Sequence, residues 1–172
     1  TRRRAMTDDA EAFWAFSLRV YAGEGVQPAC LALQDVHGLD VNVALWCAFT
    51  ASRGLDPRAA LDEARALSEA WSGDVVQPLR AARRVLKTER FEPMGIGAED
   101  RLSLRRAVQA AELDAERLEQ FALGGLIARC PRDDRPAAER AQAALEAYAA
   151  SASAREDIAI FVQNVFRAAE IE

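Results

Sequence analysis

Apolar residues recur at helical spacing along most of this chain, in stretches that glycine and proline separate. Side chains three and four residues apart share one face of a helix, whereas a half-buried strand needs alternation at every second residue. Few β-branched alternations occur here. The pattern therefore predicts an all-α fold, a helical bundle of about seven or eight helices. We expect the first helix over residues 8–22, a fifth from about 75 to 90, and a long one over about 99–129.

Capping residues mark several helix boundaries. Gly38 is positioned to end the second helix and Asp40 to cap the third. Asp56 and Pro57 have the form of a cap followed by a first-turn proline, which predicts the start of a fourth helix. The third helix is apolar almost all the way round, so we expect it at the centre of the core.

The second half of the chain carries a heptad pattern. Seven small or apolar residues are separated alternately by four and three positions, which predicts one long helix that packs lengthwise on a partner. After a turn at residues 130–136, a matching stripe over residues 137–148 predicts an αα-hairpin in a C-terminal extension. The heptad residues are Leu104, Val108, Ala111, Ala115, Leu118, Ala122 and Gly125.

The glycine- and proline-containing linker at residues 93–97 is the clearest internal boundary. It separates a helical core, residues 8–91, from residues 98–172, which hold the long helix, the hairpin return and a docking helix. We expect the two parts to form one compact unit.

Composition limits the classes of protein that fit. Apolar residues make up 51% of the chain and charged residues 28%, so a real hydrophobic core is expected. The net charge of −5 has the wrong sign for a dedicated nucleic-acid binder. No apolar run approaches a membrane span of about 18 residues, and we expect a cytoplasmic protein. All but one of the 22 basic residues are arginine, which indicates a bacterial source.

Three stretches carry a family resemblance. Residues 13–54 read FWAFSLRVYAGEGVQPACLALQDVHGLDVNVALWCAFTASRG, residues 75–84 read VVQPLRAARR, and residues 111–120 read AELDAERLEQ. Together they resemble a proteobacterial family known as domain of unknown function 2390, with coverage to about residue 130 and no match over residues 131–172. The resemblance implies an all-helical fold and supplies no catalytic residue, cofactor or partner.

The densest polar group within an apolar stretch is a candidate site around the only histidine. An acid–base pair of Asp35 and His37 is one interpretation. The other is structural, because residues two apart do not face each other on a helix and His37 suits a helix C-terminus. The candidate residues are Gln34, Asp35, His37 and Asn42.

No metal or cofactor is predicted. The three cysteines, Cys30, Cys47 and Cys130, are widely spaced, with no CxxC pair and one histidine to join them. A carboxylate-bridged metal site in a bundle needs a Glu-x-x-His pair on each of two helices, which one histidine cannot supply. We expect Cys30 and Cys47 to be buried and unreactive.

The fifth helix carries the only basic stripe, which could bind phosphate, RNA or DNA, or an acidic protein surface. Internal pairing with the acidic residues Glu112, Asp114, Glu116 and Glu119 of the long helix is the other interpretation. No aromatic residues interleave the stripe to stack on bases. The stripe consists of Arg80, Arg83, Arg84, Lys87 and Arg90.

The terminal helix has a strongly amphipathic face that could dock into a partner groove, on its own domain, or on a second copy. Membrane-surface binding is disfavoured, because Arg167 is almost the only cation among Glu156, Asp157, Glu170 and Glu172. The face consists of Ile158, Phe161, Val162, Val165 and Phe166.

Three functions remain open. The first is a non-enzymatic protein-interaction or adaptor module in the bacterial cytoplasm, for which homodimerisation would be natural. The second is a binding protein for a small apolar ligand held in the bundle by its aromatic residues. The third is an enzyme that uses residues 34–42. The aromatic set is Phe13, Trp14, Phe16, Trp46 and Phe49.

Overall fold

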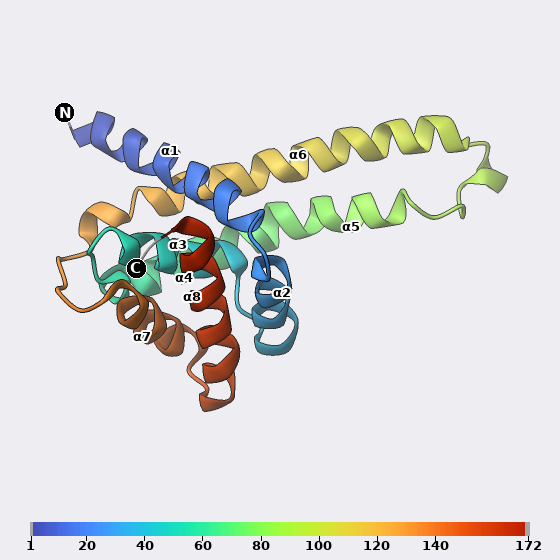
Figure 1. The fold of residues 1–172 in the computed structure, drawn as a ribbon. Coiled ribbons are helices and arrows are strands. Elements are labelled where there is room, and N and C mark those ends of the chain that lie inside the picture. Colours follow the sequence, from blue (N-terminus) through green and yellow to red (C-terminus); the bar gives the residue numbers. More distant parts are fainter. Residues whose placement is uncertain (1, 171–172) are drawn as a thin grey trace. The chain divides into compact units, whose positions relative to one another are not determined.

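The computed structural model describes residues 2–170, with side chains from residue 8 onward, and these residues form eight α-helices and no strand. The all-α prediction is confirmed. Short 3₁₀ turns and one π turn, Ser72–Val76, connect the helices. The helices are α1 (Arg2–Tyr21), α2 (Val26–His37), α3 (Val41–Ser52), α4 (Leu61–Trp71), α5 (Gln77–Val85), α6 (Ala98–Gly124), α7 (Ala137–Ala149) and α8 (Arg155–Ala169), and Figure 1 shows them along the chain.

The predicted caps at the α2–α3 junction are confirmed. Gly38 ends α2 with a φ of 67°, a left-handed conformation that glycine adopts without strain. The Asp40 carboxylate accepts the backbone N–H groups of Asn42 and Val43 at 2.8 and 3.2 Å. Two orphan donors at the start of α3 are thereby satisfied, which fixes where this central helix begins.

The chain divides into two compact units. One, here called the core unit, contains the described residues of 1–68 and 120–172, and the other, here called the arm, is residues 69–119. The expected division ran from 8 to 91 and from 98 to 172. Residues 69–91 instead belong to the arm, whereas α7 and α8 belong to the core unit.

The core unit is organised around α3, on which residues 43–51 are all buried. α7 packs against α3, and α8 packs against α2, α7 and α1. The return from α6 therefore runs onto α3 and α8, where the sequence predicted a hairpin along the long helix. The largest fully buried side chains of this unit include Trp46, Phe13, Phe161, Leu33, Leu123 and Leu145.

A buried arginine joins the C-terminal extension to α3. Arg140, on α7, is 7% exposed, and its guanidinium donates from Nη2 to the Ala51 carbonyl at 2.8 Å and from Nε to the same oxygen at 3.1 Å. Nη1 donates to the carbonyls of Asp133, at 2.7 Å, and Arg135. This one side chain therefore supplies hydrogen-bond donors to backbone carbonyls in both the last turn of α3 and the loop before α7.

Gly124, at the end of α6, allows a close approach to α1. A Cβ at this position would lie 2.7 Å from the Cα of Ala10, a contact that real Cβ atoms do not make. The structure shows why it is there, since glycine lets two backbones meet inside the core unit.

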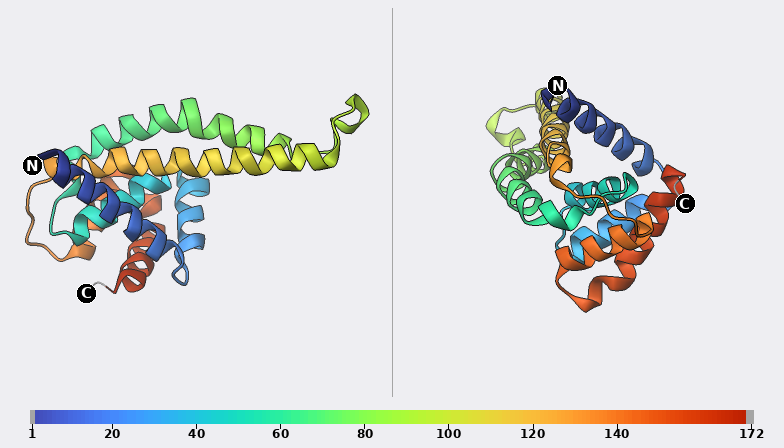
Figure 2. Two further views of the ribbon diagram at one scale, coloured as in Figure 1. Left: turned by 90° about the horizontal axis from the view of Figure 1, so that it is seen from above. Right: turned by 90° about the vertical axis from the view of Figure 1, so that its left-hand side faces the viewer.

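The arm is an antiparallel pair of helices, α5 and the first part of α6, which run side by side in Figure 1 and in the left-hand view of Figure 2. The linker at residues 93–97 forms the turn between them and is exposed throughout. At the other end of the arm, the Trp71 indole N–H donates to the Ala115 carbonyl at 2.9 Å. The linker is therefore the tip of a helical hairpin.

The heptad stripe of α6 lies only partly against α5. Ala115 is buried, but Leu104 and Leu118 are 54% and 59% exposed. The buried positions on the arm's stretch of α6 include Arg101 and Glu112 instead. The side of α6 that carries the ion pairs therefore faces α5, and the apolar stripe lies beside that contact. No helix among the described residues is long and apolar enough to cross a membrane.

Candidate functional site

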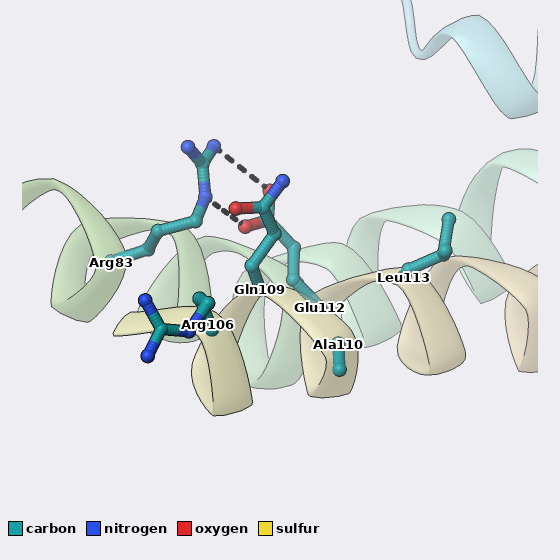
Figure 3. Close-up of a pocket in the computed structure, with 6 residues that line it drawn as sticks. All are labelled: Arg83, Arg106, Gln109, Ala110, Glu112 and Leu113. Atoms are coloured by element: carbon teal, nitrogen blue, oxygen red, sulfur yellow. Dashed lines mark hydrogen bonds and ion pairs between the residues drawn. The ribbon is translucent and has the colours of Figure 1, made fainter. Parts of the chain in front are cut away.

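Two arginines of the predicted basic stripe form ion pairs inside the arm. Arg80 donates from Nε to Glu112 and from Nη2 to Glu116, both at 3.0 Å, and Arg83 donates from Nε to Glu112 at 2.5 Å. Figure 3 shows the Arg83–Glu112 pair. These four side chains thus form one cluster of ion pairs between α5 and α6, which is the internal pairing considered for the stripe.

The cluster favours the ionised form of its acid. Burial by itself would raise the pKa of the Glu112 carboxyl, but hydrogen bonds from Arg83 and Arg80, with their positive charges, outweigh burial and hold that pKa below its ordinary value of 4.5. Glu112 is 7% exposed and carries bonds from both arginines. It is therefore the central acceptor of the α5–α6 contact.

The rest of the basic stripe points elsewhere. The Arg90 guanidinium stacks over the Phe91 ring at 4.6 Å from its centroid, and Arg84 and Lys87 are exposed. A surface groove of about 450 Å³ lies beside the cluster, with Arg106 and Gln109 on one wall and Arg83 on another (Figure 3). The five residues of the stripe therefore do not form one continuous basic surface.

The four candidate polar residues bind separate partners. Gln34 donates to the neighbouring Asp35 at 3.2 Å on the exposed surface of α2. Asn42 accepts a hydrogen bond from Gln120 at 2.8 Å. Asp35 and His37 do not form the pair that an acid–base mechanism would use, because Asp35 accepts from Gln34 and His37 pairs with a different aspartate.

His37 pairs with an aspartate that sequence reasoning missed. Its Nε2 lies 2.7 Å from Oδ2 of Asp157, at the start of α8, and the His37 side chain is 8% exposed. The pair joins the C-terminus of α2 to the N-terminus of α8. A helix C-terminus favours a positive charge, as on a protonated His37, and a helix N-terminus favours a negative charge, as on Asp157. A separation of 120 residues leaves no local pattern from which this contact could be predicted.

The three cysteines are buried thiols. Burial raises the pKa of Cys30 to about 12 and that of Cys130 to about 11, and burial is also the main cause that raises the pKa of Cys47. Such thiols stay protonated near neutral pH, so they are poor nucleophiles and poor metal ligands. Among the described residues, no group of three or more His, Cys, Asp or Glu is placed to hold a metal ion.

The terminal-helix face lies inside the core unit. Its residues Ile158, Phe161, Val162, Val165 and Phe166 are all 0–5% exposed, because α8 packs against α2, α7 and α1 of the same chain. This face is therefore occupied and offers no surface to a second protein. Of the three possibilities left open by the sequence, docking on its own domain is the one found, and α7 and α8 together cover the core of α1–α3.

The core aromatic rings pack on each other. Phe13 and Phe49 stack with ring centroids 5.4 Å apart, and Phe16 lies 5.2 Å from Phe49. Trp46 is fully buried, whereas Trp14 is half-buried. These rings fill the centre of the core unit rather than lining one shared surface.

Large apolar side chains are exposed mainly on the arm. Six of the eleven exposed large hydrophobic residues in the described chain lie there, although the arm is less than a third of the sequence. Such a concentration on one element is typical of a surface that meets another molecule. The six are Met94, Ile96, Leu102, Leu104, Leu113 and Leu118.

Comparison with known proteins gives one family. Residues 12–123 match the model of a family described as a protein of unknown function, DUF2390, and this match covers about two thirds of the chain. No curated protein and no solved structure matches the chain. The match includes α2, α3, α4 and α5 whole and ends one residue before the end of α6. By this match the chain belongs to the DUF2390 family.

Proposed function

We propose that this protein is a non-enzymatic protein-interaction module of the bacterial cytoplasm and that the arm is its binding element. The observation that carries the proposal is the concentration of exposed large apolar side chains on the arm. Leu104, Leu113 and Leu118 are each more than half exposed. Burying apolar surface is the main favourable contribution to association, so the arm has the most to gain from a partner.

The polar chemistry of the arm supports an apolar mode of binding. The ion pairs of Arg80 and Arg83 with Glu112 and Glu116 satisfy these four side chains internally. A binding partner would therefore be held by the leucine-bearing sides of the helices, with charged residues at the rim.

The candidate catalytic residues support interaction over catalysis. Gln34, His37 and Asn42 each have a different partner, and these partners lie on α2, α8 and α6. A reaction needs its acid, base and nucleophile gathered around one substrate atom. The geometry around this segment instead ties helices of the core unit together.

Capture of binding partners by the immobilised full chain tests the proposal. Lysate from the source cells, treated with nuclease, is passed over the wild-type chain and over a Leu104→Asp/Leu118→Asp variant. We expect the variant to lose at least about tenfold of any specific capture, since two buried leucines contribute roughly 1.5–3 kcal/mol each.

The matched control is a Leu31→Asp/Val36→Asp variant, which alters two exposed apolar residues of α2 that are 52% and 70% exposed. This control should capture as the wild type does. If the α2 variant loses capture and the α6 variant keeps it, the arm is not the binding element.

A further inference from the structure

The middle of the arm carries a band of positive charge. Residues 75–88, which include α5, and residues 101–111 of α6 contain seven basic residues and no acidic one. These two segments lie beside each other, because Arg83 binds Glu112 and the Arg101 guanidinium donates to the Leu86 carbonyl at 3.1 Å. The chain as a whole has a net charge of −5, so this cationic band differs in sign from the rest of the protein.

Only part of this charge is neutralised within the chain. Arg80, Arg83 and Arg101 each bind a glutamate. The other four basic residues of the band form no ion pair with any described residue, and three of them are exposed to solvent. These four are Arg84, Lys87, Arg105 and Arg106, of which Arg105 is half-buried.

Two of the unpaired cations lie on the side of α5 where Arg80 reaches α6. Arg80, Arg84 and Lys87 are separated by four and three residues, so they share one side of the helix. The helical hydrogen bonding continues to Lys87, whose backbone N–H donates to the Arg84 carbonyl at 3.1 Å. Since Arg80 on this side binds Glu116 at 3.0 Å, Arg84 and Lys87 lie along the edge of α5 that borders the Glu116 side of α6.

The groove lies along this same side of α6. Arg106, Gln109, Leu113 and Glu116 are separated by three, four and three residues, so they share one side of the helix, and the first three line the groove (Figure 3). Leu102, one turn before Arg106, continues that side. Leu102 and Leu113 are 42% and 55% exposed. The α6 wall therefore combines exposed leucines with an unpaired arginine.

The charge at the groove selects an anionic ligand. Among the described residues that line the groove, Glu112 is the one acid, and it already accepts hydrogen bonds from Arg80 and Arg83. A carboxylate that enters the groove would meet the unpaired Arg106 on one wall and the two unpaired cations of α5 on the other edge. Complementary charge of this kind favours one class of partner and disfavours basic ones.

From this arrangement we infer that the groove of the arm binds an acidic amphipathic segment of a partner protein. Its carboxylates pair with Arg84, Lys87 and Arg106, and one of its apolar side chains packs against Leu113, as an amphipathic helix does in a groove. The inference rests on the proposed function and states the chemistry of the partner segment that enters the groove. Leu104 and Leu118 do not line the groove, so variants of the two surfaces test the two ideas separately.

A protein segment fits this side of the arm better than a nucleic acid does. Phosphate groups could pair with the cations, but they would leave Leu102 and Leu113 in contact with water. Residues 75–88 and 101–111 contain no Phe, Tyr or Trp on which bases could stack. An acidic segment with apolar residues uses both the charge and the leucines.

Photo-crosslinking in the full chain tests the chemistry of the occupant. Gln109, an exposed residue of the groove, is replaced by the photo-reactive benzoylphenylalanine. The chain is irradiated in lysate of the source cells without nuclease treatment, and mass spectrometry identifies the attached molecule. We expect a protein segment in which acidic residues outnumber basic ones and which carries at least one large apolar residue. The same replacement at Leu31 of α2, which is 52% exposed, is the control and should not attach this segment.

Binding of the identified segment, made as a synthetic peptide, supplies the second measurement. Arg84→Glu/Arg106→Glu should raise the Kd of the peptide at least about tenfold with unchanged helical circular dichroism, because two ion pairs become repulsive contacts. Replacing the peptide's carboxylates by amides should weaken its binding to the wild-type chain in the same direction. The matched control, Arg19→Glu/Arg132→Glu, reverses two exposed arginines of the core unit and should bind as the wild type does.

Several results would overturn the inference. These are a neutral or basic crosslinked segment, a crosslink to RNA, DNA or a second copy of the chain, no crosslink at Gln109, or an unchanged Kd in Arg84→Glu/Arg106→Glu. If Gln109 attaches nothing while Leu104→Asp/Leu118→Asp still loses capture, the proposed function stands without this inference. If the wild-type chain also captures nothing, both fail.

Discussion

At the residue scale, Arg140 is the buried arginine on which two backbone segments of the core unit depend for hydrogen bonds. It is a buried charge whose guanidinium donates to three backbone carbonyls, those of Ala51, Asp133 and Arg135, with no carboxylate among these partners. A planar fork of N–H donors suits this arrangement, and the single ammonium of lysine does not reach it. The end of α3 and the loop before α7 therefore depend on one side chain.

We predict that Arg140→Lys lowers the free energy of unfolding by roughly 2–4 kcal/mol, because two or more buried carbonyls lose their donors. The measurement is urea unfolding followed by circular dichroism. Arg132→Lys is the control, since Arg132 is an exposed arginine in the same loop, and it should stay within about 0.5 kcal/mol of the wild type. Equal stability of the two variants would show that the Arg140 bonds contribute little.

The Glu112 cluster predicts a pH dependence of the arm. The folded-state pKa of Glu112 lies below the ordinary 4.5, so its pairs stabilise the arm at pH values above 4.5, and this contribution is lost as the pH falls through the folded-state value. We expect the hydrogen-exchange protection factors of α5 to fall on acidification. Glu112→Gln should show reduced protection already at about pH 7 and a weaker dependence on pH.

Asp114→Asn is the matched control for this prediction, because Asp114 is an exposed acid of the same helix, two residues from Glu112. Its protection of α5 should follow the wild type across the same pH range. Full protection of α5 in Glu112→Gln at neutral pH would contradict the view that these ion pairs hold the arm together.

Sequence predicted residue roles well where the reason is local. The Asp40 cap and the left-handed Gly38 follow from their own backbone surroundings and are confirmed. The His37–Asp157 pair joins residues 120 apart, and the Gln120–Asn42 pair joins residues 78 apart. Such contacts depend on how the helices pack, which no local pattern encodes. Most of the candidate site therefore had to come from the structure.

At the element scale, the heptad pattern predicted the helix α6 correctly but did not predict which side of it is buried. The long helix is present, but its apolar stripe is largely exposed and its buried side carries Arg101 and Glu112. Hydrophobic spacing predicts a helix and its apolar side, but it ignores complementary charges on a neighbouring helix. Here the side of α6 that faces inward is the one whose Glu112 pairs with two arginines of α5.

The helices α7 and α8 supply a layer of the core that residues 1–129 lack. Leu145, Ile158, Phe161 and Val165 are fully buried, and each contributes about 1.5–3 kcal/mol. Their sum is comparable to the entire stability of a typical domain, about 5–15 kcal/mol. We therefore predict that a chain ending at Arg129 has no cooperative unfolding transition and aggregates or binds a hydrophobic dye.

A peptide of residues 130–172, added to that truncated chain, serves as the control. It should restore the near-ultraviolet circular dichroism of the buried Trp46 if the missing layer is the only defect. Cooperative unfolding of the truncated chain by itself would show that α1–α4 form a core without α7 and α8.

At the scale of the whole molecule, the chain combines a closed core unit with an arm that leaves apolar surface exposed. Composition and periodicity predicted the all-α class, and the family match agrees with the resemblance over residues 13–123. The division into units differs from the expected one, because the linker at 93–97 is a hairpin tip and the segment that returns to the core starts at residue 120. A proline and glycine cluster signals a turn but does not reveal which neighbours it joins.

The most direct test of the account is hydrogen exchange along the full chain, measured once on the dilute purified protein and once in the complex that it forms in its source cells. The account predicts slower exchange on binding over residues 79–86 of α5 and 102–118 of α6, with no change over residues 26–37 of α2. Slower exchange confined to the core unit, with the arm unchanged, would contradict it.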